Sequence, residues 1–400
     1  MVNVIGLGYI GLPTALMLAA HGVEVVGTDY NSAVVERLNR GEITFQEKGL
    51  EELFADATAK GIRFSTEYQP TDTYIVSVPT PYDEETKQVD PVYIISAVKE
   101  ILKVCPNGAV VIIESTVSPG TIDRYVRPLL EQSQKALHLA HAPERIIPGN
   151  MIFELEHNSR TIGADDADVG EKIRGLYASF CKGNIVLTDI RTAEMTKVIE
   201  NTYRAINIAF ANELLMLCRQ EGMDVHEIIR ICNMHPRVNI LSPGPGVGGH
   251  CIPVDPWFLV GDFPQQTPLI HKALQINENM PRFVLSRIET LMQEHGISDF
   301  SKVGLYGLTY KEDVDDLRES PTLQLLKLLD AKGLRCKLYD PMVSRFERPL
   351  CQSMEEFLDG TELVVLMVGH SHIKTEAELL LEKLVLDTRR VLSGTNIVYL

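Results

Sequence analysis

Residues 1–11 read MVNVIGLGYIG, an apolar run that leads directly into a glycine-rich turn. The run predicts a buried strand, and Gly6, Gly8 and Gly11 follow it with the G-x-G-x-x-G spacing that opens a helix. In this pattern the first glycine permits a tight turn, the second lets the backbone approach a pyrophosphate, and the third lets helix and strand pack closely. The stretch therefore predicts a dinucleotide-binding βαβ unit. A glycine turn of an unrelated α/β protein is the competing interpretation.

An acidic residue stands where such a unit contacts the adenosine ribose. Asp29 directly follows the next apolar run, 23–28. A carboxylate at this place accepts hydrogen bonds from the ribose hydroxyls and repels a 2′-phosphate. We therefore expect NAD rather than NADP as the cofactor.

The sequence that follows alternates β-rich and helical patterns. β-rich runs at 73–78 and 109–115 are separated from the first two by helical spacing, as at 13–21 and 91–103. Alternation of this kind predicts a parallel, doubly wound sheet, in which ligands lie beyond the carboxyl ends of the strands. The loops after these two runs should then face the cofactor, although their composition also suits plain turns. The loop residues concerned are Pro79, Thr80 and Thr116.

The middle of the chain has a different pattern. Residues 192–222 form a long helical pattern that Thr192 could cap and Gly222 could end. Such a helix spans about 45 Å at about 1.5 Å per residue, long enough to connect two domains. A second helical pattern covers 268–295, so this region is predicted to be all-helical.

Strand–helix alternation resumes at Lys302 and partly repeats the start of the chain. Residues 302–307 resemble residues 2–7, and Asp340 follows a β-rich run as Asp29 does, although so short a match could be chance. We expect two Rossmann-like doubly wound parallel-sheet domains joined by an all-helical middle domain with a long central helix. The expected domains are 1–190, which binds NAD; 191–298, which is helical; and 299–400, which is the second sandwich.

Composition narrows the class of protein. A net charge of −16 over 400 residues argues against nucleic acid as a partner, because a phosphate backbone requires a basic surface. The longest apolar runs, such as 363–368, are too short to span a bilayer, so no membrane partner is expected. Seven scattered cysteines without a C-x-x-C pair are typical of reduced thiols in a cytoplasmic protein. No metal is expected.

Cys251 is a candidate nucleophile. It follows residues 243–249, a Gly- and Pro-rich stretch that cannot form a helix and that exposes backbone N–H groups to a ligand. A thiolate can hold an aldehyde between two hydride transfers. A nucleophilic cysteine in a chain that also has a dinucleotide-binding unit therefore suits oxidation of an alcohol to an acid. The alternatives are a buried structural cysteine or, with His250, a metal site, for which further ligands are missing.

Lys197 and Asn201 share one face of the long helical pattern, because they are four residues apart. Together they could meet a polar ligand. A solvated surface lysine is the alternative interpretation.

These motifs, taken in order, resemble those of the UDP-glucose/GDP-mannose dehydrogenase family over nearly the whole chain. The motifs are Gly6-x-Gly8-x-x-Gly11, Ser115-Thr116, Ala142-Pro143-Glu144-Arg145, Glu194-x-x-Lys197-x-x-x-Asn201, Gly248-Gly249-His250-Cys251-x-x-x-Asp255 and Lys311-x-x-x-Asp315-Asp316-x-Arg318. The resemblance implies oxidation of the C6 hydroxymethyl of a nucleotide sugar to a carboxylate, with two NAD and one water.

Roles for the reacting groups follow from the same resemblance. Cys251 would capture the aldehyde as a thiohemiacetal, which is then oxidised to a thioester. Lys197 would stabilise the oxyanion at C6 and would act with Asp255 and a water as general base. Glu144, with Thr116 nearby, would activate the hydrolytic water. Asn201 would bond to the sugar or to the oxyanion.

The resemblance also implies two sets of binding residues. The cofactor set is Gly6, Gly8, Tyr9, Ile10, Gly11, Asp29, Pro79, Thr80, Thr116 and Arg318. The substrate set is Glu144, Arg145, Lys197, Asn201, Arg237, Gly249, Lys311 and Arg389. Arg237 would serve the neighbouring subunit's sugar site, so a homodimer or higher homo-oligomer built around the long helix is expected. The resemblance thus implies that 191–298 is the dimerisation domain and that 299–400 binds the UDP-sugar.

Two departures from the UDP-glucose pattern indicate the substrate. Val254 stands where that branch usually has Lys, and Arg145 stands where it has an aromatic residue. The chain is instead similar to the branch that acts on UDP-N-acetylhexosamines, and residues 235–246 favour UDP-N-acetyl-D-mannosamine. UDP-N-acetylglucosamine and UDP-glucose are the alternative substrates. A two-electron hydroxyacid dehydrogenase and a non-catalytic nucleotide-sugar sensor are the alternative functions.

Overall fold

Strand β1 (Val2–Ile5) and helix α1 (Gly11–Ala20) form on either side of the glycine turn, as the sequence predicts. The computed structural model of this chain describes residues 1–83, 85–147 and 149–400. The described residues fall into two compact units. The first contains Met1–Glu200 and Gly261–Phe263, and the second contains Asn201–Val260 and Pro264–Leu400.

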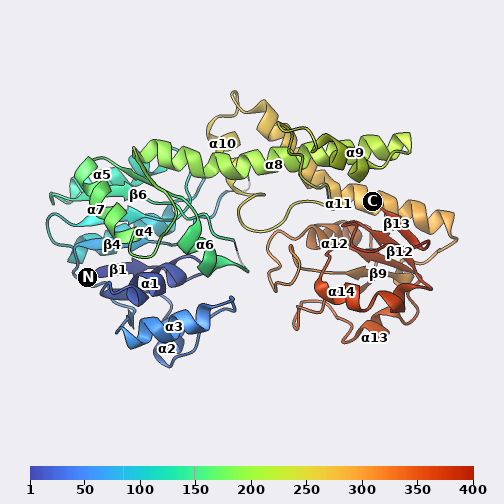
Figure 1. Cartoon of the computed structure of the whole chain (residues 1–400), viewed down its shortest axis with the longest axis horizontal. Coiled ribbons are helices and arrows are strands. Elements are labelled where there is room, and N and C mark those ends of the chain that lie inside the picture. The colour runs from blue at the N-terminus through green and yellow to red at the C-terminus, as the bar shows by residue number, and fades with distance from the viewer. Residues whose placement is uncertain (84, 148) are drawn as a thin grey trace. The chain divides into compact units, whose positions relative to one another are not determined.

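The first unit is built on an eight-stranded sheet with the order β3-β2-β1-β4-β5-β6-β7-β8 (Figure 1). The strands after β1 are β2 (Val25–Thr28), β3 (Arg63–Ser65), β4 (Thr73–Val76), β5 (Val110–Ile113), β6 (His138–His141), β7 (Arg160–Ala164) and β8 (Ile185–Thr188). Neighbouring strands are parallel except β6 and β7, which pair antiparallel. The strand order reverses at β1, and a sheet of this type binds its ligand at that point, beyond the carboxyl ends of the strands.

Helices cover both faces of this sheet. Val4 and Ile112 belong to one apolar core, whereas Ile5 and Val111 belong to another. Successive side chains of a strand point to opposite faces, so the two cores are the two sides of a doubly wound sheet. The covering helices are α1, α2 (Ser32–Asn39), α3 (Leu50–Ala59), α4 (Val92–Val104), α5 (Arg127–Gln132), α6 (Met151–His157) and α7 (Ala167–Tyr177).

The second unit contains a five-stranded sheet, all of it parallel, with the order β10-β9-β11-β12-β13 (Figure 1). Its strands are β9 (Val303–Tyr306), β10 (Lys337–Tyr339), β11 (Leu363–Leu366), β12 (Leu384–Asp387) and β13 (Ile397–Tyr399). One core joins this sheet to α11 (Pro268–Glu294) and α12 (Pro321–Ala331), and another joins it to α13 (Met354–Leu358) and α14 (Ser371–Thr375). The fold class predicted from the sequence, with two parallel-sheet sandwiches, is confirmed.

Along the chain, the elements between the last strand of the first sheet and the first strand of the second sheet are helices. They are α8 (Ile190–Glu221), α9 (Val225–Cys232), α10 (Asp255–Asp262) and α11. Helix α8 has 32 residues and ends at Gly222, whose φ of 69° is the left-handed conformation expected there. Among the described residues, no helix has both the length and the apolar character needed to cross a membrane.

The predicted start of α8 at Thr192 is wrong by two residues. Helix α8 begins at Ile190, and the side chain of Asp189 accepts hydrogen bonds from the backbone N–H and the hydroxyl of Thr192. Asp189 is therefore the capping residue, because its carboxylate satisfies an N–H group that the first helical turn leaves without a partner.

The repeat suggested by the sequence is visible in the hydrogen bonds of the two sheets. The Leu7 backbone N–H donates to Asp29 Oδ2 at 2.8 Å, and the Leu308 backbone N–H donates to Asp340 Oδ2 at 2.5 Å. In both sandwiches the acidic residue after the second strand holds the turn that follows the first strand.

Candidate active site

The glycine turn of the first unit fits a bound dinucleotide. A side chain at Gly6 or Gly11 would overlap backbone atoms, since a Cβ at Gly6 would lie 2.6 Å from Ser77 O and one at Gly11 would strike Gly6 O. Gly8 is different, because it is exposed and a Cβ there would meet no atom within 4 Å. The turn is thus tightly packed on its inner side and open at Gly8, where the pattern predicts the pyrophosphate.

Asp29 is held in a position suited to a ribose. One carboxylate oxygen accepts the Leu7 N–H, and the other accepts the Asn31 N–H at 2.9 Å. Asp29 is only half-buried, so each oxygen retains a lone pair for a hydroxyl donor. The exposed Tyr9 lies beside this turn in sequence, and its ring centroid is 4.4 Å from that of Phe45.

The loops after β4 and β5 are joined to each other. Thr80 Oγ1 donates to the Thr116 carbonyl at 2.8 Å, and Ser115 Oγ donates to the Val78 carbonyl at 2.7 Å. The two loops leave the carboxyl ends of the adjacent strands β4 and β5, of which β4 pairs with β1. The exposed Pro79 and the half-buried Thr116 therefore lie at the edge of the sheet where β1 carries its glycine turn.

Glu144 lies just beyond β6 and is buried. Its Oε1 accepts the Arg145 backbone N–H at 2.7 Å, and its Oε2 accepts a hydrogen bond from Arg160 Nη2. Arg160 also reaches Glu114 Oε1 at 3.5 Å, and its Cζ lies 4.1 Å from the centroid of the Tyr177 ring. Sequence reasoning missed Arg160 and the two residues that hold it, Glu114 and Tyr177. The one available signal was an arginine at the start of the apolar run 160–164.

The guanidinium of Arg145 is mostly engaged within the first unit. Its Nε and Nη2 contact the Glu200 carboxylate, Nη1 donates to the Ser159 carbonyl at 2.6 Å, and Nη2 donates to Thr161 Oγ1 at 3.0 Å. A guanidinium has five N–H donors, so little capacity remains for a substrate. The side chain fixes the segment that carries Glu144.

Lys197 is buried on α8, one helical turn before Asn201. Its neighbour His141, at the end of β6, is fully buried, and its Nδ1 contacts the Ile113 carbonyl at 2.8 Å. His141 Nε2 has no hydrogen-bond partner among the described residues. Burial, together with the smaller effect of the positive charge of Lys197, lowers the pKa of His141 to about 4. His141 is thus a neutral residue beside the predicted oxyanion-stabilising lysine, and sequence reasoning missed it.

The first turns of α8 are tied to the loop after β5. Glu194 accepts backbone N–H groups from Gly120 at 2.5 Å and from Ile122 at 2.9 Å. Burial raises the pKa of Glu194 to about 7, against the opposing effect of these two hydrogen bonds. This carboxylate therefore fixes the helix that carries Lys197 relative to the loop that carries Thr116.

In the second unit, Asn201, Cys251 and Asp255 lie together. Asn201 Nδ2 donates to Asp255 Oδ2 at 2.7 Å, and the Asp255 backbone N–H donates to the Cys251 carbonyl at 2.8 Å. Asp255 and Asn201 are buried, whereas Cys251 is exposed in the turn that leads into α10. The alternative of a buried structural cysteine is therefore wrong for Cys251.

The glycine-rich loop before Cys251 packs against the segment after β9. A Cβ at Gly248 would lie 2.8 Å from the Glu319 carbonyl, and one at Gly249 would lie 2.9 Å from the ring of Tyr310. The Gly249 backbone N–H donates to the Arg318 carbonyl at 2.9 Å. The pKa of Tyr310 is raised to about 12, chiefly by burial and in part by Cys251. Tyr310 is thus a neighbour of Cys251 that sequence reasoning did not identify.

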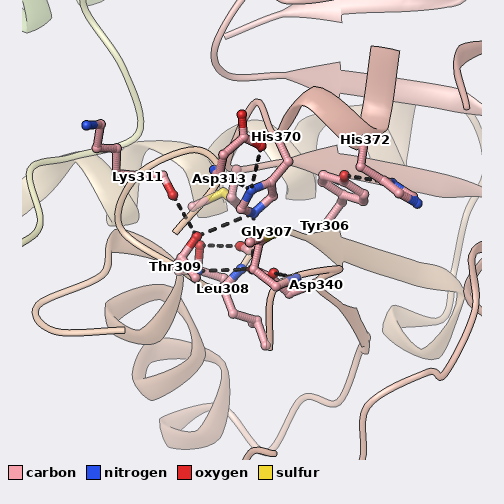
Figure 2. Close-up of polar contacts among 12 residues, drawn as sticks. Tyr306, Gly307, Leu308, Thr309, Lys311, Asp313, Asp340, His370 and His372 are labelled. Carbon is pink, nitrogen blue, oxygen red and sulfur yellow. Dashed lines mark hydrogen bonds and ion pairs between the residues drawn. The ribbon is translucent and has the colours of Figure 1, made fainter. Parts of the chain in front are cut away.

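Polar contacts around His370 fix the loop that carries Lys311 (Figure 2). His370 Nε2 lies 3.3 Å from Asp340 Oδ2, and the Asp313 backbone N–H donates to His370 Nδ1 at 3.0 Å. Thr309 Oγ1 donates to the Lys311 carbonyl at 2.9 Å, while Figure 2 shows the Lys311 side chain directed away from this cluster. Asp340 is buried by these contacts, so the counterpart of Asp29 is not available to a ribose in the second sandwich.

The remaining arginines of the expected substrate set, Arg389 and Arg237, and of the cofactor set, Arg318, are placed as follows. Arg389 follows β12, its Nε donates to the Met367 carbonyl at 3.1 Å, and its Nη1 lies 3.0 Å from the position of a Cβ at Gly244. Arg237 is exposed beyond α9, and Arg318 contacts the Asp316 carboxylate. None of the described His, Cys, Asp and Glu side chains gather in a group of three or more that could hold a metal ion.

The fold and the open glycine turn define a dehydrogenase class that binds NAD on its first sandwich. Comparisons with known proteins narrow this further. Residues 1–181 match the NAD binding domain of the UDP-glucose/GDP-mannose dehydrogenase family, residues 191–279 its central domain and residues 304–394 its UDP binding domain. The chain belongs to this family.

Named relatives share most of the chain. A UDP-N-acetyl-D-mannosamine dehydrogenase of Methanococcus maripaludis is 41% identical over 97% of this chain and 92% of its own length. An NDP-N-acetyl-D-galactosaminuronic acid dehydrogenase of Ralstonia nicotianae is 38% identical over 99% and 97%. The solved structure of a UDP-D-ManNAc dehydrogenase from Pyrococcus horikoshii has a TM-score of 0.93 at 34% identity and covers 100% of this chain and 98% of that one.

Proposed function

We propose that this dehydrogenase oxidises the C6 hydroxyl of UDP-N-acetyl-D-mannosamine to the carboxylate in two stages. Per sugar, two NAD and one water are consumed and two NADH and three protons are released. The exposed thiol of Cys251, in a loop held by Gly249 and Tyr310, is the observation that carries the two-stage reaction. The choice of sugar is supported by the relative with 41% identity.

Bound NAD supplies the hydride acceptor for each oxidation. Gly6, Gly8 and Gly11 hold its pyrophosphate, and Asp29 holds its adenosine ribose. The remaining proposed contacts come from Tyr9, Ile10, Pro79, Thr80, Thr116 and Arg318.

The chain's own groups carry the chemistry at C6. The sulfur of Cys251 adds to the aldehyde carbon, and the ammonium of Lys197 stabilises the oxygen that becomes negative. Asp255 accepts protons with the help of Lys197, and its orientation is set by the hydrogen bond from Asn201. In the last step the oxygen of water bonds to C6, the C6–Sγ bond breaks, and a water proton passes to Glu144 while the sulfur leaves as thiolate.

Further substrate contacts are proposed for Gly249, Arg237, Lys311 and Arg389, with Arg145 acting mainly on the position of Glu144. The expected domains, 1–190, 191–298 and 299–400, are supported by the three matched segments of the family. A cytoplasmic location is proposed from the cysteine pattern.

We also propose that α8 mediates a homodimer. Tyr203, Phe210 and Leu217 are spaced seven residues apart, so they share one face of the helix, and each is at least half exposed. A stripe of large apolar side chains on one helix face is typical of a protein interface. In such a dimer Arg237 would contribute to the sugar site of the partner.

The test of the reaction is the number of NADH molecules per sugar. We expect two NADH per UDP-N-acetyl-D-mannosamine at exhaustion, with slower turnover of UDP-N-acetylglucosamine, UDP-N-acetylgalactosamine and UDP-glucose. One NADH per sugar would instead indicate a two-electron dehydrogenase. Faster turnover of another sugar would overturn the choice of substrate and leave the chemistry intact.

A further inference from the structure

The carboxylate of Glu144 contacts the buried guanidinium of Arg160. Arg160, on β7, is 3% exposed, and its Nη2 donates to Glu144 Oε2. Its other terminal nitrogen, Nη1, reaches Glu114 Oε1 at 3.5 Å, and the Tyr177 ring lies against its guanidinium. Arg160 is therefore fixed on three sides, by two carboxylates and one aromatic ring.

The buried charges depend on one another. Burial raises the pKa of Glu114 to about 7, while the charge of Arg160 lowers it. Burial lowers the pKa of Arg160, but the charges of Glu144, Tyr177 and Glu114 raise it by more, so the guanidinium stays charged. An opposite charge beside a buried carboxylate stabilises its ionised form, and Arg160 supplies that charge to both Glu114 and Glu144.

The contacts of Glu144 fix its orientation and leave it able to accept further hydrogen bonds. Oε2 is occupied by Arg160 and Oε1 accepts the Arg145 backbone N–H, so both oxygens are oriented before any ligand arrives. Each oxygen keeps one further lone pair. This arrangement suits a group that must accept a proton from a water molecule in a defined place.

The same network reaches the glycine turn. Glu114 accepts hydrogen bonds from Ser77 Oγ at 2.5 Å and from Thr14 Oγ1, on α1, at 3.3 Å. Ser77 in turn packs against the turn, because a Cβ at Gly11 would lie 2.9 Å from Ser77 Cβ. A chain of polar contacts thus runs from Ser77 and Thr14 through Glu114 and Arg160 to Glu144, and Ser77 connects it to the turn by packing.

We propose that Arg160 is a positioning residue, which holds the Glu144 carboxylate in one orientation for hydrolysis of the thioester and links it through Glu114 to the glycine turn. This inference rests on the proposed role of Glu144. Arg160 touches neither substrate nor cofactor in the proposed reaction, so its effect on the reaction passes through Glu144.

The variants that test this are Arg160→Met, Arg160→Lys and Tyr177→Phe. Arg160→Met removes the charge, and Arg160→Lys keeps the charge but loses the two-pronged contact. Tyr177→Phe keeps the ring against the guanidinium and removes only the hydroxyl that Glu114 accepts at 3.2 Å. Arg127→Met is the matched control, because Arg127 also binds two carboxylates of the first unit, those of Asp123 and Asp165.

The measurement combines a single-turnover burst of NADH with intact mass spectrometry of the denatured enzyme, with NAD and UDP-N-acetyl-D-mannosamine as probes. For Arg160→Met we expect a normal burst of two NADH per site, then a kcat lower by about 100-fold or more, with KM within about threefold of wild type. The sugar acid should remain attached to Cys251. The acidic limb of the kcat profile should move to higher pH, and Arg160→Lys should partly restore both properties.

The following outcomes would overturn the positioning role of Arg160 or the proposed function. If folded Arg160→Lys and Arg160→Met match Arg127→Met in kcat, in acyl-enzyme content and in pH profile, the inference is wrong. If Arg160→Met does not fold, the comparison of Arg160→Lys with Arg127→Met decides. A folded Arg160 variant that loses the NADH burst and forms no acyl-enzyme would count against the positioning role, because an earlier step would then be affected. If wild type yields one NADH per sugar, the proposed function itself fails. If Glu144→Gln leaves hydrolysis unchanged, the proposed role of Glu144 fails, and the positioning role of Arg160 fails with it.

Discussion

At Cys251 the proposed reaction depends on a single exposed sulfur atom at the end of a glycine-rich loop. The loop is closely packed, because its glycines leave no room for a side chain against Tyr310 and the Glu319 carbonyl. Cys251 is thus exposed and held in place, as a nucleophile must be.

Cys251→Ser is expected to lower formation of the sugar acid by about 1,000-fold or more, because a neutral hydroxyl is a far weaker nucleophile than a thiolate. NADH and acid formation from UDP-N-acetyl-D-mannosamine would be measured together. Cys232→Ser, at a half-buried cysteine of the same unit, is the control and should behave as wild type. Undiminished acid formation by Cys251→Ser would mean that the second oxidation needs no covalent intermediate.

Two glycines of the turn, Gly8 and Gly11, are expected to respond differently to the same substitution. Gly8→Ala should leave the melting temperature within about 2 °C of wild type and weaken NAD binding at least about tenfold, because the added methyl group fills only the open side of the turn. Gly11→Ala should lose several degrees of melting temperature, since its methyl group overlaps the Gly6 carbonyl. Thermal denaturation and NAD titration would check both. Equal stability of the two variants would contradict the packing argument.

At the scale of elements, the start of α8 is held by one buried carboxylate. Glu194 accepts two backbone N–H groups from the loop after β5, and burial raises its pKa to about 7. A raised folded-state pKa means that the folded protein binds a proton more tightly than the unfolded chain does. Stability from this group is therefore complete below the ordinary pKa of a glutamate and is lost as the pH rises through about 7.

Glu194→Gln should remove this pH dependence. Between pH 4.5 and 7.5 the wild type should lose about 2 kcal/mol or more of stability relative to Glu194→Gln, which corresponds to several degrees of melting temperature. Melting curves of both proteins across this range give the difference. Glu171→Gln, on the exposed side of α7, should instead follow the wild type. A constant difference between wild type and Glu194→Gln would show that folding does not raise the pKa of Glu194.

At the scale of the whole molecule, the apolar stripe of α8 predicts the oligomeric state. We expect the double variant Tyr203→Glu/Phe210→Glu to weaken self-association by at least about 100-fold, because two large aromatic side chains would be replaced by charges. Light scattering after size exclusion should show a dimer for wild type and a monomer for the variant, with loss of activity because Arg237 no longer reaches a partner. Lys327→Glu, at an exposed position of α12, is the charge-changing control. A wild-type monomer with full activity would overturn the proposal.

The repeat of one hydrogen bond in the two sandwiches is also a feature of the whole molecule. Both use an acidic residue to hold a turn, yet Asp29 is half-buried whereas Asp340 is covered by His370 and Thr309. The two related sandwiches therefore differ in the group that would meet a ribose. The open carboxylate that favours NAD occurs in the first sandwich and not at the equivalent place in the second.

The sequence by itself determined the elements whose signals are local. The glycine turn, the strand–helix alternation, the long helix and the loop before Cys251 could all be predicted, because turn geometry and apolar periodicity depend on residues close in the chain. The tertiary structure alone decided which isolated polar residues meet. Glu114, Glu144, Arg160 and Tyr177 are far apart in sequence, and each taken alone has an ordinary alternative role. Folding of the sheet brings them into one buried place, where removal from water makes every charge depend on its partners.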